Sequence, residues 1–384
     1  MYTLELNELS IEQFLADYWQ KKPLCIRGGF RHFSDPLTAD ELAGLALEEN
    51  VDARLIKKDG ANWQLDEGPF DDFNQYGEKD WTLLVQAVDH WHPDAAQLLE
   101  AFRFIPNWRI DDLMVSFSTP GGGVGAHLDQ YDVFIIQGEG KRRWRVGMPD
   151  ASLKQFCPHP RLLQVSDFDA CIDVEMEPGD ILYIPPGCPH EGTSLEASLN
   201  YSVGFRAPAQ KDLIGGLADY MLDFQLEGKR YTDQSRTINA SSGRIEQNDV
   251  AAIRQLMQQL LDDEQLISEW FGSYITQPKH ELDQQEPDPH YQPDEIAEYL
   301  EEGSVLARLG GLRCSYFQAK SDADVQLFIH GDRFPLPPEE TETAQLLTDY
   351  PRLSIEQARH FLHTPERLYF ISQLINQGYW YFEE

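Results

Sequence analysis

The spacing of apolar side chains along the chain predicts helices and strands in its first hundred residues. The sequence Ser-Ile-Glu-Gln at residues 10–13 is a capping box that predicts a short helix, and Thr-Ala-Asp-Glu at residues 38–41 predicts the start of a second. Residues 24–26 predict a strand, and residues 55–68 predict a short hairpin. Residues 80–91 carry tryptophan, leucine and valine at helical spacing, so they predict a helix.

Further along the chain the period changes to two, which indicates β-strands. The even positions Asp112, Met114, Ser116 and Ser118 form one face of the first such strand. A row of small polar side chains either lines a cavity or faces solvent, and this strand alone favours neither interpretation.

The β pattern continues through residues 131–137, which predict a strongly apolar strand. Gly138-Glu139-Gly140 then predicts a hairpin turn. On the return strand, Arg142 and Trp144 share one face with the apolar Val146, so the guanidinium points inward.

Two more strands are predicted further along the chain. Residues 178–180 predict a turn, residues 181–184 a buried strand, and residues 185–187 a second turn that delivers His190. Residues 199–205 predict the last strand, with Asn200 and Ser202 on one face.

A candidate metal site emerges from these strands. His127 and Asp129 are one residue apart, so in an extended segment both side chains can face one cavity. His190 is the best candidate for a third ligand. Two histidines and one carboxylate on one face of an octahedron are diagnostic of non-haem Fe(II) enzymes, because three positions stay open for a cosubstrate and O₂.

The inward direction of Arg142 suggests an anionic ligand. A buried guanidinium is costly unless it meets an anion. A bidentate pair with a carboxylate is its natural partner, and a dicarboxylate cosubstrate would supply one.

The second half of the chain has a different character. Two amphipathic helices are predicted, one at residues 211–228 and the other at residues 248–271. Residues 276–293 are proline-rich and form a linker. Beyond it we expect a helix at residues 293–300, strands at residues 305–309 and 325–334, and helices that start at Ser354 and Pro365. This order suggests a winged-helix-like domain.

The composition limits the classes of binding partner and indicates the cellular compartment. The net charge of −34 argues against binding to nucleic acid or anionic membranes and favours a basic partner. The winged-helix-like segment does not change this, because residues 276–384 hold eight Lys and Arg against twenty Asp and Glu, whereas DNA readers present a basic face. Five cysteines without a Cys-x-x-Cys pair, and no apolar leader or long apolar run, predict a cytoplasmic protein.

Four motifs carry a family resemblance: RIDDLMVSFS, PGGGVGAHLDQYDVFIIQGEGKRRW, EPGDILYIPPGCPHEG and NYSVGFRAP. Residues 14–208 resemble the JmjC class of 2-oxoglutarate oxygenases. The whole chain resembles the bacterial ribosomal oxygenases that hydroxylate an arginine of a large-subunit ribosomal protein. The resemblance implies a mainly β catalytic domain, a double-stranded β-helix or cupin-like jelly roll, with a helical dimerisation segment and a winged-helix-like C-terminal domain. We place these at residues 1–208, 209–275 and 294–384, with the linker at 276–293.

The resemblance also implies the chemistry. Fe(II) would be held by His127, Asp129 and His190, and 2-oxoglutarate by Arg142 with help from Ser118 and Asn200. Oxygen, Fe(II) and 2-oxoglutarate would together hydroxylate the substrate and release succinate and CO₂. The expected assembly is a homodimer. The alternative function is a non-hydroxylating metal-binding cupin coupled to a winged-helix regulatory module.

The strand faces suggest how a substrate arginine would be held. Asp112 lies on the same face as Ser118, Tyr131 follows two residues after Asp129, and Ser202 shares a face with Asn200. We predict that Asp112 pairs with the arginine while Tyr131 and Ser202 orient it. The competing interpretation is that Asp112 braces its own strand beside Asp111.

Overall fold

Two antiparallel β-sheets are formed by the N-terminal half of the chain in a computed structural model that describes residues 2–60, 62–234, 236–238 and 241–383. The chain divides into two units. The first consists of Met1–Ala207, Lys279–Leu312 and Pro351–Glu384, and the second of Pro208–Pro278 and Arg313–Tyr350.

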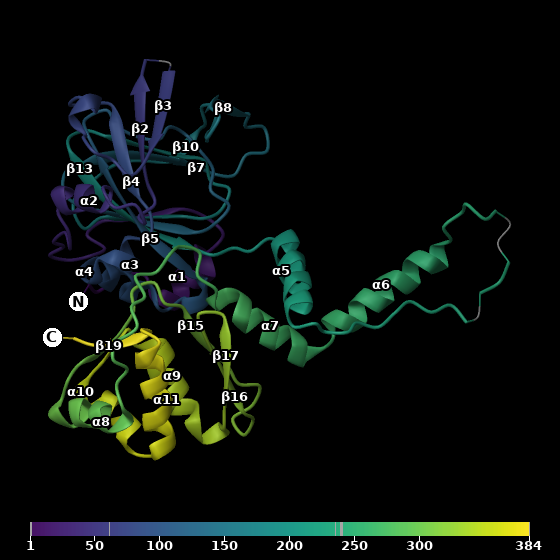
Figure 1. Ribbon diagram of the computed structural model, residues 1–384. Coiled ribbons are helices and arrows are strands. Elements are labelled where there is room, and N and C mark those ends of the chain that lie inside the picture. The colour runs from purple at the N-terminus through teal and green to yellow at the C-terminus, as the bar shows by residue number, and fades with distance from the viewer. Residues whose placement is uncertain (1, 61, 235, 239–240, 384) are drawn as a thin grey trace. The chain divides into compact units, whose positions relative to one another are not determined.

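The large sheet of the first unit has the strand order β1-β11-β6-β13-β5-β4-β2-β3, and the small sheet has the order β10-β7-β12. Figure 1 labels β2, β3, β4, β5 and β13 of the large sheet and β7 and β10 of the small one. The strands of the large sheet are β1 (Leu24–Ile26), β2 (Ala53–Asp59), β3 (Asn62–Glu67), β4 (Trp81–Val85), β5 (Ile110–Ser118), β6 (Val133–Gln137), β11 (Ile181–Ile184) and β13 (Ser198–Phe205). Those of the small sheet are β7 (Arg142–Gly147), β10 (Ala170–Met176) and β12 (His190–Ser194), and a separate hairpin is formed by β8 (Gln155–His159) and β9 (Leu162–Val165).

Both faces of the large sheet are buried at strands β4, β6 and β11, which explains the continuous apolar runs in these strands. Val133 and Ile135 of β6 pack with Trp144 and Val146 of the small sheet. Phe134 of β6 points the other way, where its ring centroid lies 5.6 Å from that of Phe14 on helix α1 (Ile11–Asp17). The two sheets with a core between them confirm the predicted cupin-like sandwich.

The predicted hairpin between β6 and β7 is wrong. Strand β6 pairs with β11 and β13, whereas β7 pairs with β10 and β12, so the turn at residues 138–140 carries the chain from one sheet to the other. Gly140 has a φ of 76°, and a Cβ there would lie 2.1 Å from the carbonyl oxygen of Ala197. The glycines therefore allow a close crossing between sheets, which local sequence alone does not distinguish from a hairpin turn.

The helix predicted at residues 80–91 is also mostly wrong. Residues 81–85 form β4, all five of them buried, and only α3 (Val88–Trp91) is helical. β4 pairs with both β2 and β5. A short apolar run fits a doubly buried strand as well as a helix, so its periodicity does not separate the two.

The other N-terminal predictions are confirmed. Ser10 caps α1 and Thr38 caps α2 (Ala39–Leu45), each with a complete capping box. The remaining helices and short strands of the first unit are α4 (Pro93–Ala96), α8 (Pro293–Glu302), α10 (Ile355–Ala358), α11 (Pro365–Asn376), β14 (Leu306–Arg308), β18 (Arg352–Leu353) and β19 (Trp380–Phe382). Residues 277–292, all of them described, contain no helix or strand, as their proline content predicts.

The second unit combines helices α5 (Gln210–Asp223), α6 (Gln247–Leu261), α7 (Glu264–Thr276) and α9 (Thr341–Asp349) with a sheet of β15 (Cys314–Phe317), β16 (Val325–Ile329) and β17 (Asp332–Leu336). The helix predicted at residues 248–271 is in fact two helices. The side chain of Asp263 accepts a hydrogen bond from the Leu266 amide and so caps a new helix, α7. Within the described residues, no helix is both long and apolar enough to cross a membrane.

Candidate metal centre and active site

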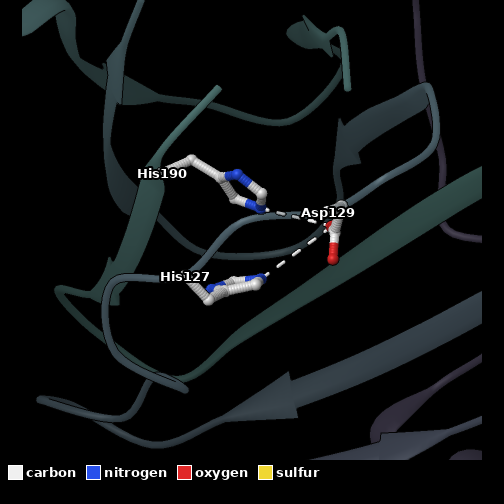
Figure 2. A group of neighbouring side chains, drawn as sticks. All are labelled: His127, Asp129 and His190. Carbon is white, nitrogen blue, oxygen red and sulfur yellow. Dashed lines mark ion pairs between the residues drawn. The ribbon is translucent and has the colours of Figure 1, made fainter. Parts of the chain in front are cut away.

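His127, Asp129 and His190 come together where the segment after β5 meets the start of β12 (Figure 2). The backbones of His127 and His190 exchange two N–H···O hydrogen bonds of 3.0 Å each. The Oδ2 atom of Asp129 lies 3.9 Å from Nε2 of His127 and 3.5 Å from Nε2 of His190. The structure thus brings the three predicted ligands into one cluster.

Backbone carbonyls orient both imidazole rings. Nδ1 of His127 lies 2.9 Å from the carbonyl oxygen of Gly125, and Nδ1 of His190 lies 3.0 Å from that of Cys188. A carbonyl oxygen only accepts hydrogen bonds, so Nδ1 carries the proton in each ring. Each ring then keeps its lone pair on Nε2, the nitrogen on the Asp129 side, as a metal ligand requires.

The protonation states also suit a cation. Burial and the neighbouring His190 lower the pKa of His127 to about 4, so its imidazole is neutral at pH 7. Burial alone would raise the pKa of Asp129, but its interactions with His190, His127 and Tyr131 outweigh that effect and lower the pKa. Two imidazoles and one carboxylate are the donor set of non-haem iron sites.

A cavity of about 650 Å³ opens beside the three ligands. Its wall includes the other candidate residues Arg142, Asn200, Asp112, Tyr131 and Ser202, and it also includes Met114 and Ser116. The polar face of β5 therefore lines a cavity rather than facing solvent.

Arg142 is a buried cation in this wall. Its guanidinium donates hydrogen bonds to the hydroxyls of Ser116 at 3.2 Å, Ser118 at 2.8 Å and Ser198 at 3.2 Å. Within the described part of the chain it contacts no carboxylate. Burial lowers the pKa of Arg142 to about 9, so it keeps its charge at pH 7. A positive charge held by neutral hydroxyls is suited to bind an anion that enters the cavity.

Three buried polar atoms at the cavity have no hydrogen-bond partner among the described residues, namely Nε of Arg142, Nε1 of Trp144 and Oδ1 of Asn200. The orientation of Asn200 follows from its neighbour Gln137. Nε2 of Gln137 is directed at backbone carbonyls, including that of Leu199 at 3.1 Å, so its Oε1 accepts from Nδ2 of Asn200 at 3.1 Å. Buried polar atoms are normally paired, so these three fit a cavity that takes up a polar ligand.

Ser118 lies behind Arg142 rather than in the cavity wall. It is fully buried, and its hydroxyl bonds to Arg142 and, at 2.8 Å, to Thr82 of β4. Ser118 thus fixes the position of the guanidinium, and its predicted help in binding 2-oxoglutarate stays a prediction.

One carboxylate oxygen of Asp112 braces a neighbouring segment, and the pairing of Asp112 with a substrate arginine stays a prediction. Its Oδ2 accepts hydrogen bonds from Gln86 at 2.6 Å and from the amide of Ala87 at 3.0 Å, so it does brace the start of α3. Its Oδ1 makes no hydrogen bond within the described residues. Burial, together with Asp89 and Asp111, raises the pKa of Asp112, and an incoming cation would offset that effect.

Tyr131 and Ser202 reach the same cavity from different elements. Tyr131 lies in the segment before β6, is 42% exposed, and has a pKa raised by burial and by the charge of Asp129. Ser202 lies on β13, opposite Met114 of β5.

Comparisons with known proteins agree with this geometry. The model of the JmjC domain family matches residues 97–213, and that of the ROXA-like winged helix matches residues 258–381. The chain is 48% identical to the ribosomal protein uL16 3-hydroxylase of Escherichia coli over 100% of this chain and 99% of that protein. It belongs to the family of bacterial JmjC ribosomal oxygenases.

Solved structures of this ribosomal oxygenase family cover the whole chain. The Escherichia coli ribosomal oxygenase YcfD in complex with cobalt and 2-oxoglutarate superposes with a TM-score of 0.89 at 46% identity, and 100% of both chains is covered. Its complex with cobalt and succinic acid also superposes with a TM-score of 0.89, at 45% identity and with 100% of both chains covered. The predicted fold class is thereby confirmed, with a helical segment and a winged-helix domain after the catalytic sandwich.

Sequence reasoning missed several residues of this ribosomal oxygenase site. Ser116 and Ser198 hold Arg142, and Gln137 orients Asn200. Ser116 could have been found, since it lies on the same strand face as Ser118 and Asp112. Thr82, which bonds to Ser118, could not have been found. Its segment is predicted from sequence to be helical, so the sequence does not pair it with β5.

Proposed function

We propose that this chain is an Fe(II)- and 2-oxoglutarate-dependent oxygenase that hydroxylates an arginine side chain of ribosomal protein uL16. The observation that carries the proposal is the uncompensated charge of Arg142 in the same cavity as two histidines and one aspartate. The relative named as a uL16 3-hydroxylase and the relative's complexes with cobalt, 2-oxoglutarate and succinic acid support it.

Different residues would bind the metal and the cosubstrate. His127, Asp129 and His190 would hold the iron, which supplies the oxidative chemistry when it is bound with 2-oxoglutarate and O₂. Arg142 would bind the carboxylate of 2-oxoglutarate that is remote from the metal, while Ser116, Ser118 and Ser198 fix its guanidinium. Products would be succinate, CO₂ and the hydroxylated side chain.

Substrate binding would depend on charge at two scales. The net charge of −34 attracts a basic ribosomal protein, and this steering weakens as salt rises. Within the cavity, Oδ1 of Asp112 is available to the guanidinium of the target arginine, with Tyr131 and Ser202 as further hydrogen-bonding groups. The cytoplasm, where ribosomes work, is the compartment consistent with this substrate.

The experiment that tests the proposal is intact-mass analysis of purified uL16 after incubation with enzyme, Fe(II), 2-oxoglutarate and O₂. A gain of one oxygen, located on an arginine by fragmentation, is expected. Anaerobic addition of Fe(II) and 2-oxoglutarate should also produce the weak visible charge-transfer band of a metal-bound keto acid. A non-hydroxylating cupin would give no gain in mass.

Asp112→Asn should lower uL16 hydroxylation by at least about tenfold, since a hydrogen bond to a charged group contributes roughly 1.5–3 kcal/mol. Asparagine keeps an oxygen that can accept from the Ala87 amide, so the start of α3 is preserved. Succinate formation without substrate protein should fall much less. The matched control is Asp111→Asn, because Asp111 is already paired with Arg206 at 3.0 Å. Wild-type hydroxylation by Asp112→Asn would show that Asp112 is not the partner of the arginine.

A homodimer is expected to form through α5 and α6. Leu222 of α5 is 75% exposed and Met257 of α6 is 56% exposed, and no residue of α6 is buried. Apolar helix faces of this kind favour association. Light scattering at micromolar concentration should give twice the chain mass of 44.1 kDa. Leu222→Glu with Met257→Glu should lower it to one chain, whereas Leu47→Glu, at an exposed leucine of the first unit, should not. A monomeric wild-type protein would contradict the prediction.

A further inference from the structure

The β8–β9 hairpin is anchored to the segment that carries the metal ligand His127. Nε2 of the buried Gln164 donates a 2.8 Å hydrogen bond to the carbonyl of Val124, and the Val165 amide donates a 2.9 Å bond to that of Ala126. A Cβ at Gly125 would lie 2.1 Å from Gln164 Nε2, so the two segments are in close contact. The hairpin therefore holds a fixed position beside the metal centre.

This anchoring places two leucines in the cavity wall. Leu162 and Leu163 of β9 both line the cavity, and Leu163 is 56% exposed. Single exposed leucines are common on protein surfaces and have no meaning by themselves. Leu163 differs because it lines, with Leu162, the cavity whose wall also includes Tyr131 and Met114. The two leucines thus add apolar side chains to the wall of the cavity that contains Asp112.

We propose that Leu163, with Leu162, binds a large apolar residue next to the target arginine in the substrate polypeptide and so determines which arginine is hydroxylated. This inference rests on the proposed function. The occupant follows from continuity, because the leucines belong to the wall of the cavity that would receive the arginine. Neighbouring residues of an extended chain are about 3.8 Å apart at Cα, so a flanking side chain stays within reach of the wall.

The leucines would add a selectivity that charge cannot provide. A basic ribosomal protein carries many arginines and lysines, and a net charge of −34 attracts all of them. Electrostatic attraction sets the rate of encounter, whereas an apolar contact discriminates between positions along the substrate. Free arginine, or an arginine flanked by polar residues, would then be a poor substrate.

The test uses the full-length enzyme with Fe(II), 2-oxoglutarate and a synthetic peptide centred on the arginine that mass mapping of uL16 identifies. Each flanking apolar residue is replaced by serine in turn. Leu163→Ser should raise the KM for the native peptide about tenfold, which corresponds to about 1.4 kcal/mol. It should have little effect on the peptide whose contacted residue is already serine, because that contact is lost in both cases. The KM for 2-oxoglutarate should change less than twofold.

Two variants keep the result interpretable. Phe156→Ser removes an apolar side chain that is 48% exposed on the same hairpin but is not part of the cavity wall, so its peptide KM should match the wild type. Leu163→Met keeps the apolar volume and should restore most of the affinity.

Each contrary result has a separate meaning. Equal effects of Leu163→Ser and Phe156→Ser, or an unchanged ratio between native and serine peptides, would overturn the inference about Leu163 alone. A change in oligomeric mass instead of peptide KM would assign the leucines to an interface between copies. Failure of the wild-type enzyme to hydroxylate uL16 or the peptide would overturn the proposed function and this inference with it.

Discussion

Asp129→Ala is expected to abolish the formation of succinate from 2-oxoglutarate. Asp129 supplies the single carboxylate of the cluster, and its Oδ2 lies within 4 Å of both imidazole Nε2 atoms. Without it, the two imidazoles would face a divalent cation without a carboxylate ligand, and the metal would be bound weakly. The loss should appear both as absent turnover and as metal content near zero after gel filtration.

A matched control separates this effect from a general loss of negative charge. Asp167→Ala removes a carboxylate whose side chain is 87% exposed and whose contact is a 3.1 Å ion pair with Arg145. It should leave metal content and turnover at wild-type levels, because exposed ion pairs contribute little. Substantial 2-oxoglutarate-dependent succinate formation by Asp129→Ala would contradict the assignment of the triad. His127→Ala and His190→Ala should likewise lose succinate formation and bound metal.

Arg142→Ala should raise the KM for 2-oxoglutarate by roughly 10- to 150-fold, the range that corresponds to a lost hydrogen bond to a charged group of about 1.5–3 kcal/mol. Arg142 is buried in the cavity wall and its charge is met only by hydroxyls among the described residues. Its removal therefore leaves a dicarboxylate without a cationic partner. The measurement is succinate formation against 2-oxoglutarate concentration at saturating Fe(II).

The neighbouring cations of the same strand region provide the control. Lys141 pairs with Glu177 at 2.6 Å and Arg143 pairs with Asp173 at 2.7 Å, and both are exposed. Lys141→Ala and Arg143→Ala should change the KM less than twofold. Equal effects of all three substitutions would mean that Arg142 has no special relation to the cosubstrate.

Much of the candidate site could be predicted from sequence because strand periodicity is a local property. The even positions of β5 and the inward face of Arg142, Trp144 and Val146 follow from alternation along one strand. The spacing of His127 and Asp129, with a turn before His190, was enough to predict the triad that the structure brings together. The capping boxes of α1 and α2 were equally local.

Other features depended on which strands become neighbours. Whether residues 138–140 form a hairpin or cross between sheets is decided by the partners of β6 and β7, and these partners are distant in the sequence. The same holds for residues 81–85, where pairing with both β2 and β5 outweighs a helical spacing. Hydrogen bonds to distant strands determine the conformation of such segments, and the periodicity within a segment does not reveal which conformation forms.

The amino-acid sequence by itself determined the metal ligands, the inward arginine and the order of a β domain followed by helices. The spacing of His127 and Asp129, the turn before His190 and the alternation of side chains along a strand are each local patterns. Only the tertiary structure decided that Ser118 supports Arg142 from behind, that Gln137 sets the orientation of Asn200, and that Leu163 reaches the cavity. These contacts join strands from different parts of the chain. Their geometry exists only after the two sheets have packed, since packing fixes which side chains share a wall.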